Sequence, residues 1–165
     1  MAKKSVGKLF EEDFIKSVPD NLFHFRFRDL PYSLIKNAKY DINNNPADFL
    51  IFCNYLFVLE LKSTNNSSYP FENTRENQVK GLEKYSHKDK TICGFVINMR
   101  KYNETYFITI KDYLYLQNES GRKSISLEDL RLFGIRIKQE LKRTRYRYDI
   151  ETFLENICNI SNNVI

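Results

Sequence analysis

The chain has 165 residues and a mass of 19.7 kDa, which is close to the usual size of one domain. Its 42% hydrophobic and 28% charged residues exclude a disordered tail, and no apolar run approaches the about 20 residues that span a bilayer. We therefore expect one cytoplasmic domain over residues 1–165, without a secretory signal or a membrane segment. The net charge of +5 favours an acidic partner.

Several common chemistries lack the residues that they need. Cys53, Cys93 and Cys158 have no metal-binding spacing, and we interpret them as buried thiols in a reducing compartment. His24 and His87 are not paired, so the chain is not expected to be a zinc hydrolase. Neither a Walker loop nor a Gly-x-Ser-x-Gly elbow is present, which excludes the common nucleotide hydrolases and serine hydrolases.

The first elements follow from the spacing of apolar residues. Residues 5–18 repeat apolar positions at helical spacing, and Pro19 ends that helix. Over 23–27, phenylalanines alternate with basic residues, which predicts a half-buried strand with a basic outer face. Residues 30–46 are expected to form an extended connection, a short projecting stalk. Two apolar runs at 48–62 then predict a tight hairpin of central strands.

The later elements complete a mixed fold. They are predicted as a helix over 73–87 that starts with a capping box of Asn73 and Glu76, strands over 91–99 and 105–110, short helices near 112–116 and after Ser126, a strand or arm over 134–148, and a final helix capped by Asp149. This order predicts an α/β fold with one central mixed β-sheet flanked by helices.

Two charges interrupt the apolar hairpin. Glu60 and Lys62 lie in the run Tyr-Leu-Phe-Val-Leu-Glu-Leu-Lys, where charge is costly unless it is paired or bound to a metal. Side chains at i and i+2 share one face of a strand, so the two point the same way. Asp48 begins the preceding strand, and hairpin pairing brings it near Glu60. The alternative interpretation of Glu60 and Lys62 is a surface salt bridge.

Two close carboxylates suit a hard cation. Asp48 and Glu60 are the candidate ligands for Mg²⁺, with Mn²⁺ as a possible substitute. Such a cation would neutralise charge on a phosphodiester, and Lys62 would orient the attacking water. Glu11 on the first helix and Gln78 on the helix after the hairpin are further candidates, although each also fits an ordinary exposed helical position.

The pattern resembles a known family. Asp48 with Glu60-Leu61-Lys62 is similar to the PD-(D/E)xK nuclease superfamily. The wider series resembles the RecU family of Holliday junction resolvases; it comprises Gly7-x-x-x-Glu11, Asp48, Glu60-x-Lys62-Ser63, Ser68-Tyr69-Pro70-Phe71, Asn77-Gln78, Gly121-Arg122-Lys123-Ser124-Ile125 and Glu128-Asp129-Leu130.

The resemblance implies more than the residues alone. It implies a restriction-endonuclease-like fold, a homodimer, Mg²⁺ dependence and paired symmetric nicks in four-way DNA junctions during recombination. It also implies a catalytic core of Asp48, Glu60 and Lys62, supported by Glu11 and Gln78. The short connection at 30–46 suits a compact, phage-encoded member. Two alternatives stay open: another nuclease of the superfamily, of restriction or repair type, and a non-catalytic protein that binds DNA junctions.

Basic residues mark a candidate DNA surface. The segment 131–148 carries seven basic residues and one acidic residue, with Tyr146 and Tyr148 interleaved. Ordinary surface charge is the alternative for each of them. The candidate DNA-binding residues are Lys3, Lys4, Arg26, Arg28, Lys36, Lys39, Arg143, Arg145 and Arg147. Partner proteins in recombination are not indicated by the sequence.

Overall fold

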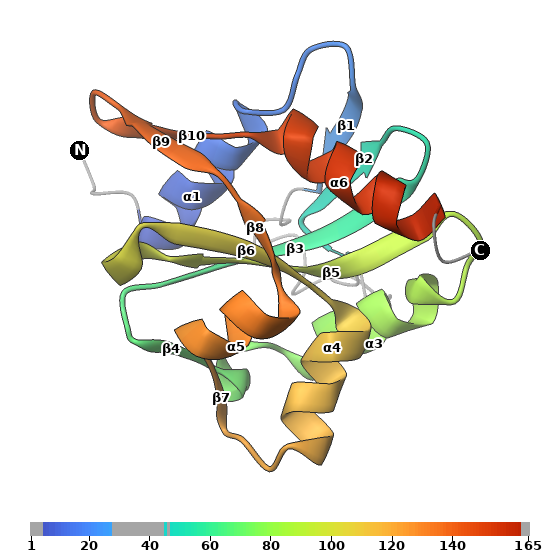
Figure 1. Ribbon diagram of the computed structural model, residues 1–165, viewed down its shortest axis with the longest axis vertical. Coiled ribbons are helices and arrows are strands. Elements are labelled where there is room, and N and C mark those ends of the chain that lie inside the picture. Colours follow the sequence, from blue (N-terminus) through green and yellow to red (C-terminus); the bar gives the residue numbers. More distant parts are fainter. Residues whose placement is uncertain (1–4, 28–44, 46, 163–165) are drawn as a thin grey trace, which may run out of the picture.

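A six-stranded mixed sheet forms the centre of the molecule (Figure 1). The computed structural model describes residues 5–27, 45 and 47–162. The strands lie in the order β1-β2-β3-β5-β6-β8; β3 and β5 are parallel, and the other neighbours are antiparallel. Their bounds are β1 Phe23–Arg26, β2 Phe49–Phe52, β3 Leu56–Thr64, β5 Thr91–Met99, β6 Glu104–Thr109 and β8 Ile135–Ile137. The predicted mixed sheet is confirmed.

Two small sheets lie beside the central one. They pair β4 (Ser68–Pro70) with β7 (Ser124–Ser126), and β9 (Gln139–Lys142) with β10 (Arg145–Tyr148). The helices are α1 (Val6–Ile15), α3 (Glu76–Ser86), α4 (Ile110–Leu114), α5 (Leu127–Phe133) and α6 (Ile150–Asn162), with short turns η1 (Phe71–Asn73), η2 (Arg100–Tyr102) and η3 (Tyr115–Glu119). Within these described ranges, no helix is long and apolar enough to cross a membrane.

Helices cover both faces of the sheet (Figure 1). On one face, α1 and α6 pack phenylalanines onto the strands, as in the contact of Phe14 with Phe49 at 5.9 Å between ring centroids. On the other face, α3, α4 and α5 enclose a second core, in which Phe95 stacks on Tyr113 at 4.2 Å. Burial on both faces explains why the central strands are almost continuously apolar.

The β2–β3 hairpin has the predicted pairing. Phe49 lies opposite Leu59, and the Asp48 N–H donates to the Leu59 carbonyl at 3.1 Å. Continuing this register places Asp48 opposite Glu60 at the end of the hairpin. The predicted approach of the two carboxylates is therefore confirmed by the strand register.

Strand β1 faces the opposite way from the prediction. Phe23 and Phe25 are 63% and 51% exposed, whereas Arg26 turns inward over the Phe49 ring and pairs with Glu11. The expected basic outer face is wrong for this strand. An alternating pattern defines two faces but does not say which one meets the core, and α1 supplies a carboxylate that accepts the inward arginine.

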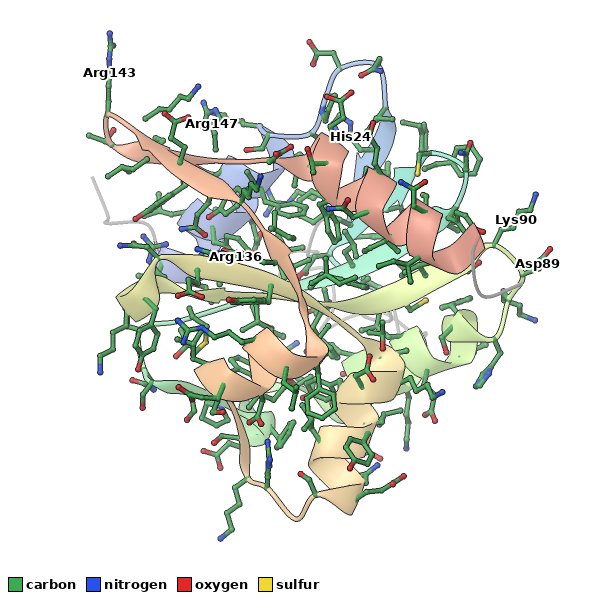
Figure 2. The ribbon with its side chains drawn as sticks, in the orientation of Figure 1. His24, Asp89, Lys90, Arg136, Arg143 and Arg147 are labelled. Atoms are coloured by element: carbon green, nitrogen blue, oxygen red, sulfur yellow. The ribbon has the colours of Figure 1, made fainter. Side chains whose placement is uncertain are left out.

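The C-terminal basic segment folds into several elements. It contains the end of α5, the edge strand β8 and the β9–β10 hairpin, which projects from the body with Arg143 at its turn (Figures 1 and 2). Arg143 has a φ of 57°, which places it in the left-handed region. The predicted stalk at 30–46 lies outside the described residues, except for position 45.

Candidate active site

Asp48 is fixed at the mouth of the hairpin. Its Oδ2 accepts a hydrogen bond of 2.7 Å from the peptide N–H of Leu61, on the neighbouring strand. Its own backbone pairs with Phe27 on one side and Leu59 on the other. The carboxylate is thus held beside the middle of β3, because both its backbone and its side chain are anchored to adjacent strands.

Glu60 is a buried acid on β3. Its residue is 3% exposed, between Leu59 and Leu61 in the central strand. Burial, followed by repulsion from Asp48, raises the pKa of Glu60 to about 7, although Lys62 opposes the change. A carboxyl group in this state gains from any cation that approaches it, because the cation relieves both causes of the shift.

Lys62 and Gln78 complete the cluster. Lys62 Nζ donates to Glu60 Oε1 at 3.0 Å and to Gln78 Oε1 at 2.9 Å. The Gln78 side-chain amide also donates to Glu60 Oε1. One amide therefore fixes both the lysine and the buried acid. The structure brings together four of the predicted site residues, Asp48, Glu60, Lys62 and Gln78.

Gln78 is oriented by the start of α3. The helix begins at Glu76 with Arg75 as its N-cap residue, and the Arg75 N–H donates to Gln78 Oε1 at 3.2 Å. The predicted capping box of Asn73 and Glu76 is wrong, because Asn73 ends the η1 turn. The helix starts later, which makes Gln78 the third helical residue and turns its side chain back toward the N-terminus.

Glu11 takes part in a different contact. It lies on α1 and forms an ion pair with Arg26 of β1, both side chains being about 30% exposed. This pair ties the first helix to the edge strand next to β2. Arg26, predicted to bind DNA, thus meets a carboxylate of its own chain, and its charge is partly compensated.

A buried series of hydrogen bonds between polar side chains was not predicted from the sequence. Ser63, which follows Lys62, donates to Asn98 Oδ1 at 3.3 Å, and Asn98 Nδ2 donates to Thr105 Oγ1 at 2.7 Å. Thr105 Oγ1 in turn donates to Gln139 Oε1 at 2.5 Å. Asn98 and Thr105 are 2% and 0% exposed. These hydrogen bonds link the end of β3 to the base of the β9–β10 hairpin. The one sequence signal for them was an asparagine within an apolar strand.

The predicted basic residues divide into distinct environments. Arg145 donates to Asp13 at 2.5 Å and to Glu12 at 3.2 Å, which fastens the β9–β10 hairpin to α1. Arg143 points away from the body at the turn, and Arg147 lies on the same hairpin (Figure 2). Lys3, Lys4, Arg28, Lys36 and Lys39 lie outside the described residues.

The residues present fit a magnesium ion. Mg²⁺ is commonly bound by one or two carboxylates, with water and substrate oxygens filling its other positions. Asp48 and Glu60 offer two such groups, and the raised pKa of Glu60 marks a site short of positive charge. In the described part of the chain, no group of three or more His, Cys, Asp and Glu side chains gathers for a metal. Two carboxylates are a donor set that suits a hard, largely hydrated cation.

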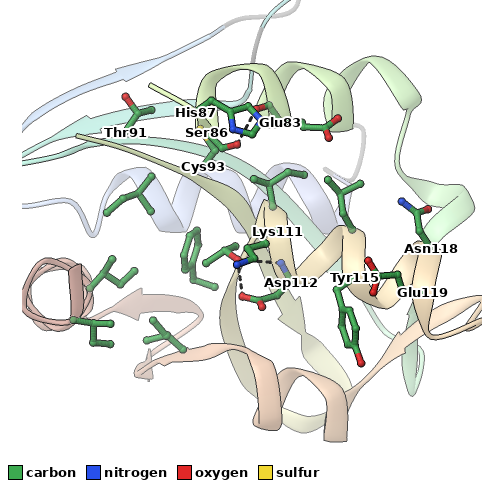
Figure 3. A pocket seen from close by; sticks show the side chains of 18 residues that line it. Glu83, Ser86, His87, Thr91, Cys93, Lys111, Asp112, Tyr115, Asn118 and Glu119 are labelled. Atoms are coloured by element: carbon green, nitrogen blue, oxygen red, sulfur yellow. Dashed lines mark hydrogen bonds between the residues drawn. The ribbon is translucent and has the colours of Figure 1, made fainter. Parts of the chain in front are cut away.

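A cavity of about 940 Å³ lies elsewhere in the described structure (Figure 3). Its lining includes His87 at the end of α3, Cys93 of β5 and Tyr115 of η3. Asp48, Glu60, Lys62 and Gln78 are absent from its lining. The candidate chemistry is thus not in this cavity but at the end of the β2–β3 hairpin.

Comparison with known proteins places the chain in a family. Residues 20–148 match the model of the RecU family, described as recombination protein U. YotM, an SPbeta prophage-derived uncharacterized protein of Bacillus subtilis (strain 168), is 28% identical over 174 residues, which cover 96% of this chain and 87% of YotM.

A solved structure has the same fold. The 1.6 Å structure of Archaeoglobus fulgidus Hjc, a Holliday junction resolvase from an archaeal hyperthermophile, superposes with a TM-score of 0.52. The match covers 78% of this chain and 93% of Hjc, at 10% sequence identity. It supports the mixed sheet predicted from the element order and the restriction-endonuclease-like fold that the resemblance implied. The family match covers most of the chain and includes Asp48, Glu60, Lys62 and Gln78, so this protein belongs to the RecU family of Holliday junction resolvases.

Proposed function

We propose that this chain, as one nuclease domain over residues 1–165, is a Mg²⁺-dependent endonuclease that resolves four-way DNA junctions in the cytoplasm. The observation that carries the proposal is the cluster at the end of the β2–β3 hairpin. There, a buried glutamate faces Asp48 and shares one hydrogen-bond network with Lys62 and Gln78. A surface salt bridge would not require a buried acid or a glutamine that holds both partners.

The proposed roles follow from these contacts. Asp48 and Glu60 would hold Mg²⁺, for which Mn²⁺ is the expected substitute, and the ion supplies electrostatic stabilisation of the charge that develops on the phosphodiester. Lys62 Nζ donates two of its three hydrogens to Glu60 and Gln78, and we propose that the third orients the attacking water. Gln78 keeps that ammonium group in place from the start of α3. Glu11 is proposed as a supporting carboxylate.

The proposed substrate contacts are mainly to phosphates. Lysine and arginine side chains give affinity without regard to sequence, and their number sets the salt dependence of binding. Among the described candidates, Arg143 and Arg147 on the projecting β9–β10 hairpin are the residues proposed to contact DNA phosphates. Arg26 and Arg145 would contribute less, because acidic residues of the same chain engage them.

Paired nicks require two active sites. We propose a homodimer with twofold symmetry, since two identical sites related in this way match the approximate symmetry of a four-way junction. Sedimentation velocity tests this directly: a species of twice 19.7 kDa is expected, and a monomer bound to the junction would contradict the proposal.

The decisive experiment is cleavage of a labelled synthetic four-way junction, with linear duplex and single strands as controls, in Mg²⁺ and in EDTA. Glu60→Gln should abolish cutting and retain binding, whereas the matched control Glu128→Gln, an exposed carboxylate on α5, should cut normally. Equal cutting of linear duplex would indicate a general nuclease. Tight binding of the junction without cutting by the parent chain would indicate a non-catalytic junction-binding protein.

A further inference from the structure

Two cysteine sulfurs that are distant in sequence meet at the closed end of the β2–β3 hairpin. Cys53 lies in the turn after β2, and Cys158 lies on α6, with 3.6 Å between the two Sγ atoms. Both are free thiols, and 105 residues separate them. We propose that Cys53 and Cys158 form a dithiol modification site. Small aminothiol disulfides oxidise these two thiols, and the product is an intramolecular disulfide.

The surroundings give a reagent access to the pair. A cavity of about 440 Å³ opens at the two sulfurs, and its lining includes Glu151, Glu155 and Asn54. Cys53 is partly exposed, whereas Cys158 is 7% exposed. Because two acids line the same cavity as the cysteines, a neutral or cationic disulfide is favoured over an anionic one. Cys53 is the first thiol to react, since it is the more accessible.

The reaction balances as two thiol–disulfide exchanges. The Cys53 thiolate attacks one sulfur of the small disulfide, whose S–S bond breaks and releases one aminothiol. The Cys158 thiol then loses its proton to solvent and attacks Cys53 Sγ, which releases the second aminothiol. Two protein thiols are oxidised, and one small disulfide is reduced to two thiols. Bond formation brings the two Sγ atoms from 3.6 Å to the about 2.05 Å of a disulfide.

The third cysteine provides an internal control. Cys93 is 3% exposed in the core on the α3 side of the sheet, and burial raises its pKa to about 12. Burial likewise raises the pKa of Cys158 to about 11, which is consistent with its role as the second thiol to react. Neither Cys53 nor Cys158 belongs to the proposed metal site, so this inference does not depend on the proposed function.

The new bond would join the β2–β3 turn to α6. Cross-linking residues so far apart removes many conformations from the unfolded chain. The oxidised protein should therefore unfold at a temperature about 5–15 °C higher than the reduced protein. The hairpin that carries Asp48 and Glu60 would then be fastened at its closed end to the C-terminal helix.

The test uses the reduced full-length chain with cystamine as the probe. After treatment, the protein is denatured in N-ethylmaleimide and its intact mass is measured. One remaining free thiol, no retained aminothiol, and a peptide that joins Cys53 to Cys158 are expected. The Cys93→Ser variant should form the same Cys53–Cys158 disulfide. The Cys158→Ser variant should retain one aminothiol, bound to Cys53 as a mixed disulfide. Three free thiols, a bond to Cys93, or a retained aminothiol on the parent chain would overturn the proposal.

Discussion

Gln78 accepts a hydrogen bond of 2.9 Å from Lys62 Nζ and donates one to Glu60 with the same side chain. A single amide at the start of α3 therefore sets the positions of two charged groups on β3. The candidate active site depends on this helix–strand contact as much as on the hairpin that brings the carboxylates together, and the consequences can be measured.

Gln78→Ala should slow cutting without weakening junction binding. Removing the amide takes one hydrogen-bond acceptor from Lys62 and one donor from Glu60. Loss of an orienting group beside a metal site typically costs 10–100-fold, here expected in kcat. Single-turnover cleavage and junction affinity should be measured together. Glu83→Ala, an exposed change on the same helix, is the control and should cut at the parental rate. A parallel loss of affinity would argue against a positioning role.

Glu60→Gln should stabilise the metal-free protein at alkaline pH. Folding raises the pKa of Glu60 from 4.5 to about 7, so the folded state binds more protons between these values and stability falls as pH rises through this window. The glutamine has no such penalty. In urea unfolding with EDTA, the free energy of unfolding of the variant should exceed that of the parent by roughly 3 kcal/mol at pH 8 and by little at pH 4. An equal difference at both pH values would exclude this linkage.

Magnesium affinity should rise with pH up to about 8. Binding requires the ionised form of Glu60, whose pKa is about 7, so each pH unit below this value should weaken the ion about tenfold. The apparent affinity can be followed by the thermal shift that Mg²⁺ produces between pH 5.5 and 8.5. Asp48→Asn should bind weakly throughout. If the Mg²⁺ affinity of the parent protein does not change with pH, the ion binds at a site other than Glu60.

Arg143→Ala and Arg145→Ala should have different effects. Arg143 projects from the hairpin turn, so its loss should weaken DNA binding without changing the stability of the protein. The slope of the logarithm of DNA affinity against the logarithm of salt concentration should become smaller by about 1. Arg145→Ala leaves the buried Asp13 without its guanidinium partner and should cost roughly 2 kcal/mol of stability. Adding Asp13→Asn should restore part of that loss. Filter binding at several salt concentrations and urea unfolding separate the two roles.

The sequence predicts those parts of the site that depend on local pairing. Asp48 and Glu60 meet because a short hairpin sets the register, and an apolar run already shows that its charges need compensation. The inward direction of Arg26 was not predictable, because it depends on where α1 packs and on Glu11 at its surface.

Contacts between distant segments were also beyond the sequence. The Arg145–Asp13 pair and the Cys53–Cys158 contact each join residues more than 100 positions apart, and composition carries no signal for such pairings. The start of α3 was misplaced because Asn73 and Glu76 satisfy the capping pattern as well as the true boundary does. Gln78 was nevertheless named as a site residue, from its place on the helix after the hairpin and then from the resemblance to the family.

The single parallel pairing in the central sheet has a consequence for the order of folding. The β2–β3 hairpin closes a short loop, whereas β3 meets β5 only after β4 and α3 have crossed the sheet. Local contacts form faster than distant ones. During refolding, Asp48 and Glu60 are therefore expected to come together before Gln78 arrives, so early intermediates should carry two neighbouring acids that α3 does not yet cover.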